Sequence, residues 1–310
     1  MGYKKTINIL SYLLLILSLY YISGRLANNY SQLSDWQLSK SVYVALIICV
    51  TAYMFSNFLL SFAWKYLLAL SGFSKISHSR CHIIYGRTQI SKYIPGNIFH
   101  FVGRYFIGKK AGIPNAVLMT STFNENIGLF IVASVITIIS YALNGVSEIG
   151  GISLYRILFF SGSSFILGYL GYYYFIRNKL ALSPISTKTN LFRVGTCYTA
   201  FFIIFATVGV VITLMIAPEA IQGNVYYIFM IFISSWVLGY MTPGAPAGVG
   251  VREAVIILLL GPLTGEGECL IIAFLFRFIT VAGDLFYFLF SYILAAYINE
   301  SDNISNPILK

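Results

Sequence analysis

Apolar stretches of about twenty residues recur along the chain and constrain its fold more than any other feature. A helix that crosses the hydrocarbon core of a bilayer needs about 20 mostly apolar residues. Six stretches approach or exceed this length: 7–22, 42–62, 115–141, 152–176, 195–217 and 269–298. Only 10% of the residues are charged, whereas soluble domains carry about 25%. The sequence therefore predicts an all-α polytopic membrane protein, one domain over 1–310 with a short polar tail at 299–310.

Two further apolar regions, 83–107 and 225–260, are each interrupted in the middle by proline and glycine. Proline cannot donate a backbone hydrogen bond and clashes with the preceding turn, while glycine tolerates positive φ. Each interruption should therefore end one half-helix and let another begin, near Asn97 and near Gly250. The residues predicted to break the helices are Pro95, Gly96, Pro243, Gly244, Gly248 and Gly250.

The charged residues between the apolar stretches predict the orientation in the membrane. Basic residues fall in alternate loops: Lys4, Lys5, Lys65, Lys75, Arg80, Lys109, Lys110, Arg177, Lys179, Lys188 and Arg193. The opposite loops hold Asp35, Glu148, Glu219, Glu266 and Glu268, with Arg25 and Lys40. By the positive-inside rule the basic loops are cytoplasmic. We expect a multi-pass protein of the cytoplasmic (inner) membrane with both termini in the cytoplasm. The net charge of +10 is then explained without nucleic acid.

With six full crossings, the basic loops stay on one side only if both interrupted regions return to the side they entered from. The region 83–107 would enter from the cytoplasm and 225–260 from outside, as two re-entrant hairpins. The halves 1–141 and 152–298 would then form an inverted-topology repeat, as in many secondary transporters. The segment PGNIFHFVGR, which begins at Pro95, also shares Pro, Gly and Arg with PGAPAGVGVR, which begins at Pro243.

Several ionisable residues lie inside the apolar regions, where each costs about 2.5–3.5 kcal/mol and usually lines an interior path. Arg104 and Arg252 are the strongest candidates for a ligand phosphate, because the guanidinium fork suits phosphate oxygens. The full set of candidate phosphate-binding residues is Arg87, Lys92, Arg104, Arg252 and Arg277. The candidate counter-charges are Glu125, Glu253 and Asp284. The surplus of bases leaves room for an anion.

Structural roles for the same residues stay open. Arg277 and Asp284 are seven positions apart, two helical turns, and could pair on one face. Glu253 could serve the positive end of a helix dipole. Arg87 and Lys92 could extend to the cytoplasmic headgroups. The proline-glycine breaks themselves could merely shape the bundle.

Three segments, SKYIPGNIFHFVGR, TPGAPAGVGVREA and FRFITVAGDLFYF, resemble the membrane region of lysylphosphatidylglycerol synthases, the multiple peptide resistance factor, and of its stand-alone relatives. The resemblance spans roughly residues 1–300. The positions that match are Pro95, Gly96, Gly103, Arg104, Pro243, Gly244, Gly248, Gly250, Arg252, Glu253, Arg277 and Gly283. Two departures are Asn124-Glu125-Asn126, where the family often has Glu-Arg, and Ala245-Pro246-Ala247, which replaces a Gly-Leu type stretch.

The resemblance implies movement of lipids between leaflets: aminoacylated phospholipids in some members, and polyprenyl-phosphate-linked sugars in others. The synthases also carry a soluble aminoacyl-transferase domain, for which the residues after 298 are too few. The resemblance thus favours a flippase without enzyme activity or cofactor, whose partner is a membrane lipid or a lipid-linked sugar. Mutual rocking of the two halves would expose its site to each leaflet.

Two other functions stay open. A lipid-linked glycosyltransferase or phosphotransferase would usually need paired carboxylates or a metal. The candidate carboxylate pair is Glu266-Gly-Glu268, for which a solvated loop is favoured. The candidate metal ligands are His78, Cys81, His82 and His100. No metal is predicted. A non-transporting scaffold or regulator of envelope lipid or polysaccharide synthesis would bind envelope-biosynthesis enzymes through a long loop, and none is evident.

The segment Gly108-Lys-Lys-Ala-Gly112 has the small-xxx-small spacing of helix dimers. A homodimer therefore stays open, although the two lysines favour a cytoplasmic turn.

Overall fold

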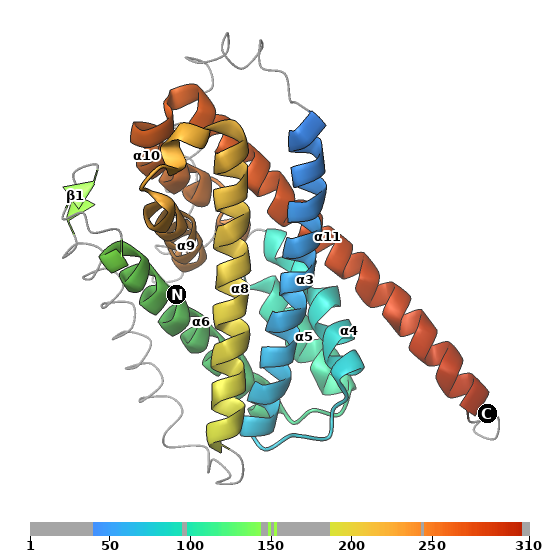
Figure 1. Cartoon of the computed structure of the whole chain (residues 1–310). Coiled ribbons are helices and arrows are strands. Elements are labelled where there is room, and N and C mark those ends of the chain that lie inside the picture. The colour runs from blue at the N-terminus through green and yellow to red at the C-terminus, as the bar shows by residue number, and fades with distance from the viewer. Residues whose placement is uncertain are drawn as a thin grey trace, which may run out of the picture.

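The computed structural model describes residues 40–94, 98–143, 148–149, 152–153, 187–242 and 245–305, and their side chains over 40–94, 98–143, 188–242 and 245–298. These residues are almost entirely helical (Figure 1), apart from a two-residue strand pair, β1 (Glu148–Ile149) and β2 (Ile152–Ser153). The predicted spans 7–22 and 152–176 lie outside the described residues, save for β2. The predicted break residues Pro95, Gly96, Pro243 and Gly244 also lie outside them.

Four long helices lie where four of the spans were predicted. They are α3 (Lys40–Leu70), α6 (Asn115–Leu143), α8 (Thr187–Ile216) and α11 (Glu266–Ser305). In the described part of the chain, five helical segments are long and apolar enough to cross a membrane. The fifth, Pro246–Thr264, falls inside the region predicted to be a re-entrant hairpin. The protein is thus helical and apolar as a multi-pass membrane protein must be, whereas the number of crossings stays a prediction.

Both interrupted regions form helical hairpins. The first consists of α4 (His78–Gln89), the 3₁₀ turn η1 (Ile90–Tyr93) and α5 (Phe99–Lys110). The second consists of α9 (Val225–Met241), the 3₁₀ turn η3 (Pro246–Gly248) and α10 (Val251–Thr264). Within each hairpin the two helices contact each other. At 1.5 Å per residue, α4 and α5, each of 12 residues, are too short to cross about 30 Å of hydrocarbon alone.

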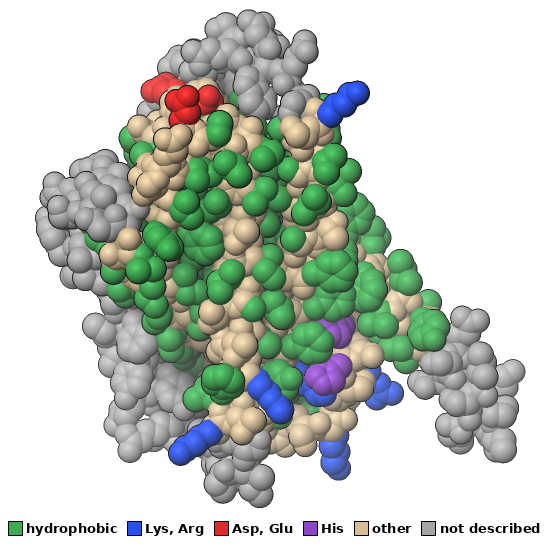
Figure 2. Space-filling model, in the orientation of Figure 1, with side chains coloured by type: hydrophobic (Ala, Val, Ile, Leu, Met, Phe, Trp, Pro, Cys, Tyr) green, Lys and Arg blue, Asp and Glu red, His purple; other side chains and the backbone are tan. Residues whose placement is uncertain are grey.

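The two hairpins begin at opposite ends of the bundle (Figure 1). His78, the first residue of α4, contacts the ring of Phe62 near the end of α3. In contrast, α9 follows η2 (Pro218–Ile221), which packs against the end of α8 and also contacts α10. Figure 2 shows acidic side chains gathered at one end of this face and most basic side chains at the other. The charge separation on which the predicted orientation rests is therefore present in the fold.

The helices pack in matched pairs. Helix α6 of the first half packs on α9 of the second, just as α11 of the second half packs on α4 of the first. Between them α3 and α8, the counterparts in the two halves, form the most extensive helix contact (Figure 1). These contacts are reciprocal between the two halves, and the inverted repeat itself stays a prediction.

The tips of the two hairpins meet. The turn η1 contacts the turn η3, and α11 also packs against η1. The apolar core around this junction includes the fully buried Trp64, Phe201, Phe205 and Tyr287. The close contact of two interrupted segments from different halves of the chain positions the site described next.

Candidate functional site

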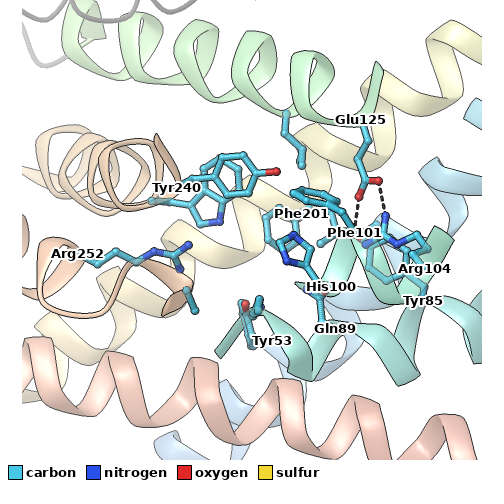
Figure 3. A pocket seen from close by; sticks show the side chains of 15 residues that line it. Tyr53, Tyr85, Gln89, His100, Phe101, Arg104, Glu125, Phe201, Tyr240 and Arg252 are labelled. Atoms are coloured by element: carbon cyan, nitrogen blue, oxygen red, sulfur yellow. Dashed lines mark hydrogen bonds and ion pairs between the residues drawn. The ribbon is translucent and has the colours of Figure 1, made fainter. Parts of the chain in front are cut away.

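A cavity of about 50 Å³ lies between the two hairpins (Figure 3). A buried water needs roughly 10–15 Å³ on this measure, so the cavity has room for a few waters or a group of similar size. Its lining comes from seven helices and both turns: Tyr53, Leu60, Tyr85, Gln89, Lys92, His100, Phe101, Arg104, Glu125, Leu129, Phe201, Trp236, Tyr240, Ala247 and Arg252. Of the predicted site residues, Lys92, Arg104, Glu125 and Arg252 line it directly.

Arg104 is paired. Its side chain is 1% exposed and forms an ion pair with Glu125 of α6. The Tyr85 hydroxyl donates a hydrogen bond of 2.7 Å to the other oxygen of the same carboxylate, and the Arg104 guanidinium lies 3.8 Å from the Tyr85 ring centroid. Glu125 therefore holds Arg104 against α6 and compensates its charge (Figure 3). The guanidinium Nε has no hydrogen-bond acceptor among the described residues.

Lys92 is paired as well. Its ammonium lies 2.7 Å from Oδ2 of Asp284, a carboxylate of α11 with no exposed surface. The Tyr93 hydroxyl donates to the same oxygen at 2.6 Å. The tip of the first hairpin is thus fastened to α11. Lys92 points inward, so the alternative that it extends to the cytoplasmic headgroups is wrong.

Arg277 connects α11 to the second hairpin. Its Nε lies 3.3 Å from Oε1 of Glu253, and its NH1 donates to the carbonyl of Ala247 at 3.1 Å. Oε2 of Glu253 accepts the backbone N–H of Gly250 at 2.7 Å. Glu253 therefore serves both as the counter-charge of Arg277 and as a cap for the first turn of α10. The predicted pairing of Arg277 with Asp284 is wrong, because each residue has a different partner.

Arg252 is the exception among the buried bases at the cavity. It is only 8% exposed, and within the described residues no carboxylate pairs with it and its Nε has no acceptor. Its guanidinium lies 5.9 Å from the centroid of the Trp236 ring. Figure 3 shows the guanidinium pointing toward the cavity from the side opposite Arg104. Arg104 and Arg252, which end the two matching ten-residue segments, thus differ in charge compensation.

The local charge balance is positive in the described part of the chain. Four buried or half-buried bases (Lys92, Arg104, Arg252 and Arg277) face three acids (Glu125, Glu253 and Asp284). Each acid is paired with one base, which leaves the charge of Arg252 uncompensated. Arg87, the remaining predicted phosphate ligand, does not line the cavity. Its guanidinium lies 4.6 Å from the Tyr292 ring centroid on α11.

The first turns of two helices border the cavity. Helix α5 begins at Phe99 with His100 in its first turn, and α10 begins at Val251 with Arg252 in its first turn. These starts lie within two residues of those predicted. Free N–H groups and the positive end of a helix dipole favour an anion. At α10 this end is already capped in part by the Glu253 carboxylate.

The tip of the second hairpin holds an unusual backbone conformation. Ala247 has a φ of 48°, and Gly248 and Gly250, two of the predicted break residues, have φ values of 72° and 83°. A non-glycine residue in this region usually costs about 1–3 kcal/mol and persists only where its surroundings hold it. Here the carbonyl of Ala247 is held by Arg277. The Ala245-Pro246-Ala247 departure therefore forms an ordered turn.

Sequence reasoning missed most of the aromatic and amide side chains around the cavity. Tyr85 and Tyr93 bind the two carboxylates. Tyr240, stacked on Trp236 at 4.7 Å between ring centroids, donates a hydrogen bond to Asn126. Tyr93 stands two positions before Pro95, and Tyr85 and Gln89 lie on the predicted half-helix. Their proximity in sequence to the helix break could have identified them as site residues.

The residues considered for a metal are not brought together. His78 and His82 pack against the rings of Phe62 and neighbouring aromatic residues, whereas His100 lines the cavity. Among the described residues no three His, Cys, Asp or Glu side chains gather in one place. Glu266 and Glu268 lie in the first turn of α11 rather than in a loop. The Gly108–Gly112 segment comprises the last three residues of α5 and a turn at Ala111 and Gly112, where Gly112 has a φ of 81°.

Comparison of the chain with models of known protein families gives no match, and comparison with curated proteins gives no relative. The functional interpretation therefore depends on the geometry of the site and on the resemblance carried by its short motifs.

Proposed function

We propose that this protein moves an anionic lipid, either a phospholipid or a polyprenyl-phosphate-linked sugar, between the leaflets of the cytoplasmic membrane. The headgroup phosphate would enter the cavity between two re-entrant hairpins while the tails stay in the bilayer. The observation that carries this proposal is Arg252, a buried guanidinium beside the cavity with no carboxylate partner among the described residues. An uncompensated charge in hydrocarbon costs about 2.5–3.5 kcal/mol, and a bound phosphate would offset that cost.

The surroundings of Arg252 favour an anion over a cation. The carboxylates near the cavity are each engaged by a base. Of the buried atoms there without a hydrogen-bond partner, Arg104 Nε, Arg252 Nε and Arg277 NH2 are donors, Asp284 Oδ1 is an acceptor, and His100 Nδ1 is either, depending on the tautomer. A phosphate supplies acceptor oxygens to such a set, and each charge-assisted hydrogen bond contributes about 1.5–3 kcal/mol.

The contacts that would have to change during transport involve α11. Lys92 and Asp284 connect α11 to the first hairpin, and Arg277 and Glu253 connect it to the second. Mutual movement of the two halves would break or exchange these pairs, while α3 and α8 stay in contact at the centre. This is alternating access around a fixed site.

The test is transfer of fluorescent phosphatidylglycerol across proteoliposomes, compared for the wild type, Arg252→Gln and the control Arg193→Gln. Arg193 is exposed on α8 beside Tyr66, away from the cavity. We expect transfer by the wild type and Arg193→Gln and its loss in Arg252→Gln, with all three proteins monodisperse. Unchanged transfer by Arg252→Gln would contradict the proposed mechanism. If wild-type vesicles transfer no faster than protein-free ones, the scaffold alternative is favoured instead.

A further inference from the structure

Two glycines enclose the side chain of Arg252. Gly239 lies buried in α9, and Gly248 lies in η3, at the tip of the same hairpin. A Cβ atom at Gly239 would lie 2.9 Å from Arg252 Nε and closer still to its Cγ. A Cβ atom at Gly248 would lie 2.9 Å from the same Nε. Real Cβ atoms essentially never approach other atoms so closely. A side chain at Gly239 would therefore displace Arg252, and one at Gly248 would meet both Arg252 and the backbone of Gly239.

The obstruction at Gly239 is specific. The three atoms nearest to a Cβ at this position all belong to Arg252, so the space beside α9 is used by this one side chain. Gly239 also stands between Trp236 and Tyr240, which line the cavity from the same helix. Glycine in a helix interior costs about 1 kcal/mol relative to alanine. The conformation of the helix does not require a glycine at this position. The side chain of Arg252, which passes close to it, does.

We propose, building on the function above, that Gly239 and Gly248 are positioning residues for the anion site: they form a slot that holds the stem of Arg252 and directs its guanidinium into the cavity. The slot explains how an unpaired arginine stays fixed without a carboxylate. A carboxylate partner would compete with the phosphate, whereas two glycines restrict the side chain sterically and leave its charge available. Gly248 also has positive φ, so Gly239 is the cleaner position to test.

The test is a double-mutant cycle of Gly239→Ala and Arg252→Ala, with Gly195→Ala as control. A Cβ at Gly195 in α8 meets no atom within 4 Å. Binding of short-chain phosphatidylglycerol and of inorganic phosphate is measured by calorimetry in detergent, and stability by thermal unfolding. We expect Gly239→Ala and Arg252→Ala each to weaken phosphatidylglycerol binding about 10- to 100-fold, the loss of one charge-assisted contact. The double variant should bind no more weakly than Arg252→Ala, and Gly195→Ala should bind as the wild type.

Stability distinguishes positioning from ordinary helix packing. Gly239→Ala should lower the unfolding temperature in the wild type but not in Arg252→Ala, where the obstructing side chain is gone. If Gly239→Ala alone does not fold, recovery of a monodisperse protein in the double variant is the same result. An equal loss of stability in both backgrounds, or wild-type binding by Gly239→Ala, would overturn the slot.

Different results of the same experiment would contradict the proposed function. Normal binding by Arg252→Ala would contradict the anion site as a whole. Loss of binding in Arg252→Ala together with wild-type binding by Gly239→Ala would contradict the slot alone. Binding of inorganic phosphate but not of phosphatidylglycerol, with the cycle intact, would support the slot and overturn the lipid as the ligand.

Discussion

The Arg104–Glu125 pair gives the sharpest prediction on stability. Replacing Glu125 by glutamine removes the negative charge but keeps the shape of the side chain and an acceptor for Tyr85. Arg104, 1% exposed, is then a buried cation without a counter-charge. Removing one partner of a buried ion pair costs about 3–5 kcal/mol, a large share of the roughly 5–15 kcal/mol of a typical fold. We expect Glu125→Gln to be strongly destabilised.

The double variant Arg104→Gln/Glu125→Gln should recover much of this loss. It removes both charges and leaves two amides that can bond to each other and to Tyr85, and replacing both partners of a buried pair is often near neutral. The matched control is Glu219→Gln, at an exposed acid on η2, where the change should stay within about 0.5 kcal/mol.

The assay can use the chain's own cysteines. Cys49, Cys81 and Cys269 are buried, so a dye that fluoresces on reaction with thiols reports unfolding in detergent. Equal unfolding temperatures for Glu125→Gln and the wild type, or a double variant no more stable than the single one, would refute the argument that Glu125 compensates Arg104.

Three further changes test other parts of the structure with the same thiol assay. Ala247→Gly should stabilise the protein by about 0.5–1 kcal/mol by relieving a φ of 48°; destabilisation would show that the turn is not strained. On α8, Gly209→Ala should cost about 1–3 kcal/mol because its Cβ would overlap the ring of Phe232 in α9. The control Gly195→Ala, in open space, should be neutral or slightly stabilising. Equal effects of the two changes would contradict the close packing of α8 on α9. Asp284→Asn should destabilise by leaving Lys92 buried without its counter-charge, and a second change, Lys92→Met, should restore stability; no recovery would mean that Asp284 has a different role.

The helices could be predicted from the sequence because their causes are local. An apolar run such as 42–62 has few other stable forms in a bilayer, and proline with glycine interrupts a helix wherever they stand. The starts of α5 and α10 followed from the same chemistry. The start of the two hairpins at opposite ends of the bundle could be predicted from the charges of the loops, which can also be read from the sequence.

The charge pairing could not be predicted because it depends on tertiary packing. The seven-residue spacing of Arg277 and Asp284 places both on one helix face, but Lys92 and Glu253 reach that face from two separate hairpins. Arg104 and Arg252 hold the same position in the two matching ten-residue segments. Only Glu125, on a helix that follows the first hairpin, distinguishes them. The charge of Arg252 is left available for an anion because of how the helices pack, and residue type alone does not indicate this.

A density map of the protein in bilayers of anionic phospholipid tests the central claim most directly. The account predicts a phosphate in the cavity between the hairpin tips, with its oxygens about 2.7–2.9 Å from the guanidinium nitrogens of Arg252, as charge-assisted hydrogen bonds require. It would be contradicted by a map in which a carboxylate neutralises Arg252, or in which lipid phosphates lie only at the headgroup level and the cavity holds water alone.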